Sequence, residues 1–193
     1  MGEFGPVADV LEYLAGEWRV ERVVRDLAGG VEGRFTGTTA FTPLDAGTGS
    51  GATAGLGSED DDGGGRAGGG GLLHHESGVF VWHGTPRPAE RTLRFLPGPR
   101  PGTAAVRFAD GRPFHDLDLG TGRYVADHPC AADHYRGEFT VTDRDHWRTV
   151  WRVAGPAKDL VLTTGYTRVR AGLTPAAATP PAGSSSGLRV PRG

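Results

Sequence analysis

The sequence predicts an all-β protein, a single antiparallel up-and-down β-barrel of about nine or ten strands with a short N-terminal helix. Short segments of alternating apolar and polar residues follow one another, separated by Gly, Pro and Asp-Gly turns. Too few helical stretches lie between them to provide the crossovers of a parallel sheet. Closure into a barrel would remove the exposed edges of such a meander. A two-sheet sandwich is the competing architecture.

The opening helix is predicted over residues 7–14. Its apolar side chains, Val7, Val10, Leu11 and Leu14, recur at helical spacing, and Gly16 ends the pattern. We therefore expect one short amphipathic helix before the first strand.

The first two strands are predicted as a hairpin. "WRVERVVRD" places Trp18, Val20 and Val24 on one face with Arg22 between them, and "VEGRFTGTTAF" alternates in the same way. The small residues 28–30 between the two segments favour a tight turn.

The remaining strands are predicted after a long interruption. Eight further segments have strand character: "LLHHESG", "VFVWHG", "RTLRFL", "AAVRF", "PFHDLDL", "YRGEFTVT", "HWRTVWRVAG" and "LVLTTGYTRVR". They complete the meander that the barrel needs.

Two segments are predicted to stay outside the folded unit. Residues 45–71 are mostly glycine, acidic and small side chains, which cannot offset the entropy of ordering the chain. The tail, residues 172–193, is rich in Pro, Ala, Ser and Gly. The expected organisation is therefore a helix in residues 1–15 and one barrel in residues 16–171, interrupted by a disordered insert at 45–71.

Composition argues against several classes of partner. The formal net charge is -2, with 21 basic and 23 acidic residues intermixed, so no basic stripe predicts nucleic-acid binding. No apolar run approaches the roughly 18 residues of a membrane helix, and the N-terminus lacks a signal-peptide pattern. One cysteine excludes an intramolecular disulfide. We expect a cytoplasmic protein, and its oligomeric state stays open.

Several segments together resemble a bacterial family, domain-of-unknown-function family 6314: "LAGEWRVERVVRD", "GRFTGTTAF", "HHESG", "FADGRPFHDLDL", "HPCAADHYRGEF", "WRVAGPAKD" and "TGYTRV". The family name implies no reaction. The long insert departs from the short connection usual in that family, which places it outside any shared activity. More loosely, the helix followed by Gly16-Glu17-Trp18 is similar to the start of calycin barrels such as lipocalins, and of nitrobindin-like barrels.

Arg22 is a candidate ligand contact because it shares a face with Trp18, Val20 and Val24. A guanidinium inside an apolar barrel needs an anionic or hydrogen-bonding partner. That partner is either a barrel carboxylate, such as Glu76 or Asp133, or the carboxylate of a ligand.

"HPCAADHY" groups His128, Cys130 and Asp133 before Tyr135. His128 and Cys130 share a strand face, but Pro129 and the lack of a paired zinc spacing argue against a metal. A lone cysteine is more often a small buried hydrophobe than a nucleophile. We therefore expect no metal and no cofactor.

"FHDLDL" and "HWRTVWRV" supply two further candidates. Alternation places His115 with Leu117 on the core face and Phe114 on the opposite face, so His115 is a ligand contact or a hydrogen-bonded core histidine. Trp151 belongs to the barrel wall or forms a stacking platform.

The predicted function is binding of a small, partly apolar molecule, with or without an anionic group, inside the barrel. The lining candidates are Arg22, His115, His128, Cys130, Asp133, Tyr135 and Trp151. The alternative is a cofactor-free enzyme with a barrel histidine as acid or base and Arg22 or Tyr135 as oxyanion donor. A haem- or metal-binding barrel is a minor alternative. No catalytic residue is assigned, and whether the chain is an enzyme stays open.

Overall fold

The structure is a computed structural model that describes residues 6–44 and 70–170. It contains one helix, α1 (Val10–Leu14), and the ten strands listed next. These are β1 (Gly16–Asp26), β2 (Val31–Pro43), β3 (Leu72–Trp82), β4 (Thr85–Pro97), β5 (Thr103–Phe108), β6 (Pro113–Asp118), β7 (Arg123–Cys130), β8 (Asp133–Asp143), β9 (His146–Gly155) and β10 (Lys158–Arg168). The predicted tail, and the predicted insert except for Gly70 and Gly71, lie outside the described residues.

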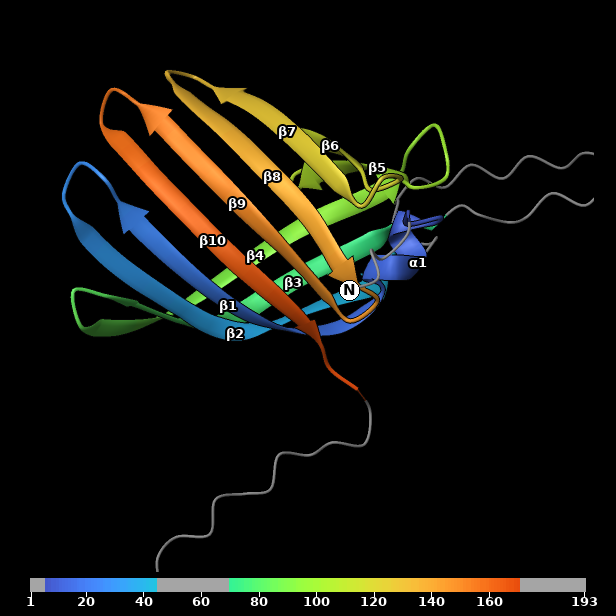
Figure 1. The fold of residues 1–193 in the computed structure, drawn as a ribbon, viewed down its shortest axis with the longest axis horizontal. Coiled ribbons are helices and arrows are strands. Elements are labelled where there is room, and N and C mark those ends of the chain that lie inside the picture. The colour runs from blue at the N-terminus through green and yellow to red at the C-terminus, as the bar shows by residue number, and fades with distance from the viewer. Residues whose placement is uncertain (1–5, 45–69, 171–193) are drawn as a thin grey trace, which may run out of the picture.

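The strands form one antiparallel sheet in the order β6-β5-β4-β3-β2-β1-β10-β9-β8-β7. Strands that follow one another along the chain pair with each other, except β6 and β7, and β1 pairs with β10. The sheet curls until its two edge strands, β6 and β7, lie side by side without a hydrogen-bonded ladder (Figure 1). The predicted up-and-down barrel is confirmed as a nearly closed barrel.

Tight hairpins define one end of the barrel, which we call the hairpin end. His83 and Gly84 connect β3 to β4 with φ values of 50° and 74°, the left-handed conformation of a type I′ turn. The β1–β2 turn, predicted at residues 28–30, lies at the same end, at the left of Figure 1.

The helix covers the opposite end, which we call the helix end (Figure 1). The Asp9 carboxylate caps α1 by accepting hydrogen bonds from the backbone N–H groups of Leu11 and Glu12, so the helix begins later than predicted. Val10 and Leu14 are buried, and the Trp18 indole donates to the Leu14 carbonyl at 2.8 Å. The helix therefore closes this end of the core.

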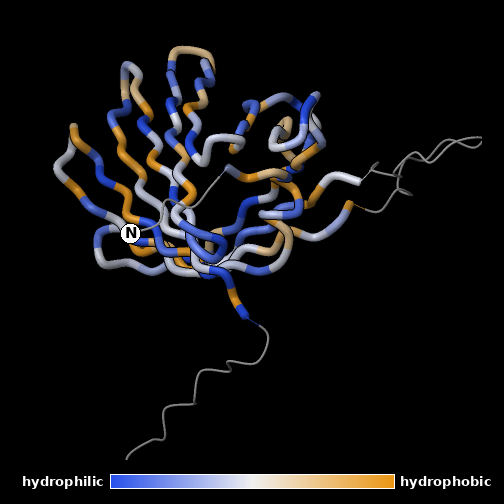
Figure 2. Tube along the Cα trace, turned by 45° about the vertical axis from the view of Figure 1, so that its right-hand side comes forward, coloured by the Kyte–Doolittle hydropathy of each residue, from blue (hydrophilic) through white to orange (hydrophobic). Residues whose placement is uncertain are grey.

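Strand alternation directs apolar side chains inward, as predicted. Trp18, Val20 and Val24 are buried whereas Arg19 and Glu21 are exposed. Figure 2 shows hydrophobic and hydrophilic residues alternating along the strands. No helix in the described part of the chain is both long and apolar enough to cross a bilayer.

A β-bulge in β6 corrects one prediction. Val106 pairs with His115 but Arg107 pairs with Pro113, so Phe114 is an extra residue in the ladder. Strict alternation would place Phe114 and His115 on opposite faces. Instead, both rings lie against Trp151, with centroids at 5.5 and 5.3 Å.

Candidate functional site

A cavity of about 110 Å³ lies in the hairpin half of the barrel. Its lining comes from six strands, β1, β4, β6, β8, β9 and β10. The lining residues are Arg22, Arg91, Phe114, Tyr135, Thr149, Trp151, Val153, Leu162, Thr164 and Tyr166. Toward the helix end, the interior is filled by buried aromatic side chains, among them Trp18, Phe41 and Trp147. Inside the barrel, the described side chains therefore leave this space in the hairpin half.

Arg22 and Glu76 form an ion pair beside this cavity. The Arg22 guanidinium donates to both carboxylate oxygens of Glu76, at 2.9 and 2.7 Å, and its Nε donates to the Thr164 hydroxyl at 2.8 Å. The side chains are only 13% and 3% exposed. Of the partners considered from the sequence, Glu76 is therefore the one that Arg22 contacts.

Electrostatics keep both groups of this pair charged. Burial alone would lower the pKa of Arg22, but Tyr166 and Glu76 hold it above its usual value. Burial alone would raise the pKa of Glu76, but the hydrogen bonds from Arg22 and the charge of Arg91 hold it below its usual value. Together with the bond to Thr164, this bidentate contact uses three of the five N–H donors of Arg22.

Arg91 is a second cavity arginine, and it is not among the lining residues predicted from the sequence. It pairs with Glu76 in the β3–β4 ladder, yet its guanidinium lies 3.7 Å from Glu76 Oε2. The side chain is 43% exposed and makes no hydrogen bond to any residue that the structure describes. Arg91 lies two and four residues before the buried Leu93 and Phe95 and therefore shares their strand face. This spacing is the signal in the sequence that predicts an inward-facing side chain.

The family comparison fits this architecture. The model of "Family of unknown function (DUF6314)" matches residues 14–168, which span the chain from the end of α1 to the end of β10. The chain belongs to this family. A search of the curated proteins gives no match for this DUF6314 chain.

Two solved structures are similar to the DUF6314 barrel. The S-type phycobiliprotein lyase CPES from Guillardia theta has a TM-score of 0.57 at 9% identity, covering 83% of this chain and 90% of its own. A protein of unknown function from the DUF3598 family of Nostoc punctiforme has a TM-score of 0.51 at 11% identity, covering 86% of this chain and 51% of its own. At these identities the likeness shows the fold alone.

Trp151 forms a flat wall of the DUF6314 cavity. Gly137 lies opposite it on β8, and a Cβ at Gly137 would come within 2.6 Å of the indole ring. The missing side chain therefore lets the indole lie against the β8 backbone. On β6, Phe114 stacks on Trp151 with ring centroids 5.5 Å apart and an interplanar angle of 13°.

His115 and His128 lie next to the cavity but do not line it. His128 contacts Phe114 at a centroid distance of 5.1 Å, and Phe114 is the lining residue. His115 Nδ1 lies 2.6 Å from the Asp116 carbonyl, so this nitrogen carries a proton and donates. Burial lowers the pKa of His115 to about 4, which leaves the ring neutral at pH 7.

The β7–β8 hairpin places Cys130 and Asp133 away from the cavity lining. The prediction that Cys130 is buried is wrong, because Cys130 lies beside the tip of this hairpin and is exposed. Asp133 accepts a hydrogen bond from Lys158 at 2.5 Å, a contact that raises the pKa of Lys158. Among residues 6–44 and 70–170, no three His, Cys, Asp or Glu side chains are grouped to hold a metal.

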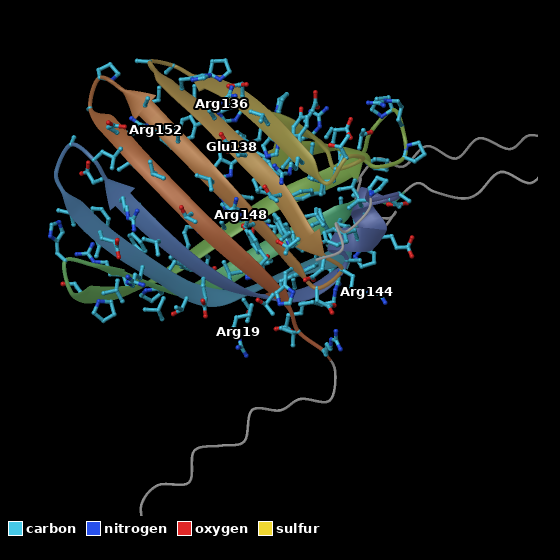
Figure 3. All side chains as sticks on the ribbon, viewed as in Figure 1. Arg19, Arg136, Glu138, Arg144, Arg148 and Arg152 are labelled. Carbon is cyan, nitrogen blue, oxygen red and sulfur yellow. The ribbon has the colours of Figure 1, made fainter. Side chains whose placement is uncertain are left out.

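Many other arginines of the barrel lie on its outer face. Figure 3 shows several of them, with Glu138, on the outside of β1, β8 and β9 and of the β8–β9 turn. The labelled arginines are Arg19, Arg136, Arg144, Arg148 and Arg152, and all of them are exposed. These residues do not contribute to the cavity.

A larger hollow, of about 870 Å³, lies outside the barrel beside α1. Its charged residues already hold the helix end together. Arg168 donates to the carbonyls of Tyr13 and Ala15, and Asp145 forms ion pairs with Arg168 and Arg170. We therefore place the candidate site in the smaller, aromatic cavity.

Proposed function

We propose that this DUF6314 protein binds a small, partly apolar, anionic molecule in the cavity at the hairpin end of its barrel. The observation that carries the proposal is the charge at the cavity. Two arginines, Arg22 and Arg91, line it, and both contact the same carboxylate, that of Glu76. Arg22 already neutralises Glu76 through two hydrogen bonds. Arg91 therefore adds a positive charge with free donors to an otherwise largely apolar and aromatic lining.

Arg91 is the proposed anion anchor. Its planar guanidinium can donate two parallel hydrogen bonds to a carboxylate, and its partial burial makes such a contact stronger than one in bulk water. Arg22 has a supporting role, because its contacts with Glu76 and Thr164 fix the charge arrangement behind the ligand.

The enzyme hypothesis has less support. It requires a histidine that reaches the bound molecule, and neither His115 nor His128 lines the cavity. Phe114 takes that position in the wall. Binding is therefore the function that the site supports best.

The proposal is tested with small carboxylates and their neutral primary amides, screened by ligand-observed NMR against the full chain. We expect carboxylates to bind and the amides to bind more weakly. Arg91→Gln should weaken carboxylate binding by about tenfold to a hundredfold, because charged hydrogen bonds contribute roughly 1.5–3 kcal/mol.

The matched control is Arg94→Gln. Arg94 is an exposed residue of the same strand and does not line the cavity, so this change should leave affinity unaltered. Equal loss in both variants, or equal binding of acids and amides, would contradict the proposal.

A further inference from the structure

The shape of the cavity, beyond its charge, restricts the ligand. We propose that the site accepts a single-ring aromatic monocarboxylate, with its ring against the wall formed by Trp151 and Phe114 and its carboxylate at Arg91. This inference rests on the proposed function and adds the planarity, the size and the single charge of the ligand.

Planarity follows from how Trp151 is held. Gly137 provides no side chain behind the indole, and any Cβ there would contact the ring at 2.6 Å. The ring of Phe139 lies nearly perpendicular to the indole, with centroids 5.7 Å apart and an interplanar angle of 82°. The indole is thus held in place by its neighbours, and Phe114, which also lines the cavity, stacks nearly parallel to it. The two rings together form a fixed aromatic wall, which favours a planar ring over a puckered one.

The size of the ligand follows from the volume of the cavity. An engineered protein cavity of about 150 Å³ binds benzene, whereas pockets for drug-sized ligands measure roughly 300–1,000 Å³. The cavity here measures about 110 Å³, closer to the benzene-binding cavity than to those pockets, so it favours one ring over a fused-ring system. The buried aromatic residues toward the helix end, Phe41 and Trp147 among them, prevent a deeper position.

The number of charges follows from the arginines. Arg22 donates three hydrogen bonds to Glu76 and Thr164, whereas Arg91 donates none to the described residues and is the arginine available to a ligand. A second carboxylate on the ligand would have no comparable partner and would lie near Glu76. A monoanion therefore matches the site better than a dianion.

The experiment measures affinity by isothermal titration calorimetry with three acids, benzoate, cyclohexanecarboxylate and 2-naphthoate. Benzoate should bind about three- to tenfold more tightly than cyclohexanecarboxylate, because stacking adds roughly 0.5–1.5 kcal/mol beyond buried area. Benzoate should also bind more tightly than 2-naphthoate. The first preference should disappear in Trp151→Leu and persist in Trp82→Leu, a change of a half-buried tryptophan that does not line the cavity.

A second variant covers the case in which Trp151→Leu does not fold. Gly137→Ala keeps the indole but displaces it, so it should also reduce the preference for benzoate. Gly165→Ala is its control, because a Cβ at Gly165 meets nothing within 4 Å.

The outcomes separate this inference from the proposed function. Equal affinity for benzoate and cyclohexanecarboxylate, or tighter binding of 2-naphthoate, would overturn the inference and leave anion binding intact. No binding of any of the three acids would overturn both.

Discussion

Arg22 and Arg91 both contact the carboxylate of Glu76, but they do so in different ways. Arg22 donates three hydrogen bonds to Glu76 and Thr164, whereas Arg91 contacts Glu76 through a looser 3.7 Å ion pair. Removing one member of a buried ion pair leaves the other charge uncompensated. We therefore assign Arg22 mainly to stability and Arg91 to the ligand.

His74 makes the stability of the folded protein sensitive to acid. The ring is 2% exposed between Phe41 and Phe95, and its Nδ1 has no hydrogen-bond partner among the described residues. Burial, assisted by the charge of Arg91, lowers its pKa from 6.5 to about 3. Between these two values the unfolded chain binds a proton that the folded protein does not. Stability therefore falls as the pH falls from 6.5 toward 3.

We predict that His74→Phe reduces this acid sensitivity. A difference of one bound proton over the two pH units from 6.5 to 4.5 corresponds to about 3 kcal/mol of unfolding free energy. The wild-type protein should lose this stability, and the variant should retain part of it. The measurement is the free energy of unfolding in urea at pH 7 and pH 4.5. His75→Phe, on the exposed face of the same strand, is the control. An unchanged pH dependence in His74→Phe would contradict the assignment.

At the scale of elements, α1 shows how a five-residue helix contributes to the barrel. A helix this short is not stable alone, so its contacts with the barrel must hold it. Leu14 is fully buried and its carbonyl accepts the Trp18 indole N–H, while Arg168 bonds the carbonyls of Tyr13 and Ala15. The helix therefore closes the helix end of the barrel, and its apolar side completes the core.

Leu14→Ala should therefore destabilise the whole barrel by about 2–5 kcal/mol, the usual cost of truncating a buried leucine. Urea unfolding monitored by tryptophan fluorescence measures this change. Glu12→Ala, on the exposed side of the same helix, should change stability by less than about 0.5 kcal/mol. Similar effects of the two variants would show that α1 does not contribute to the core.

The barrel as a whole has one gap in its hydrogen bonding, between the edge strands β6 and β7. These strands end the sheet, and aromatic contacts rather than a ladder connect them, with Phe114 contacting His128 across the gap. Ladder hydrogen bonds protect backbone amides, so protection should be lowest where they are missing.

Hydrogen exchange followed by mass spectrometry should show faster exchange in β6 and β7 than in β1 and β10. The central pair β1 and β10 has strand partners on both sides, which makes it the internal reference. A carboxylate that binds in the cavity should slow exchange around Phe114. Equal protection in all ten strands would indicate that the barrel closes fully in solution.

The sequence by itself determined the local pattern of this DUF6314 barrel. Alternation along β1 and β9 placed Trp18, Val20, Arg22 and Trp151 on inward faces, and turn residues located the β1–β2 hairpin. These features follow from one strand at a time, because the side-chain period of a strand is two whatever its neighbours are.

Only the tertiary structure decided which inward residues share one cavity. Arg91 became a candidate because ladder register places it opposite Glu76 on β3, and Phe114 because a bulge breaks the alternation. Cys130 was misplaced because its exposure depends on its position beside a hairpin tip, where neighbouring strands no longer cover it. Register, bulges and strand ends are set by packing between segments far apart in the chain, so the pattern within a single segment does not specify them.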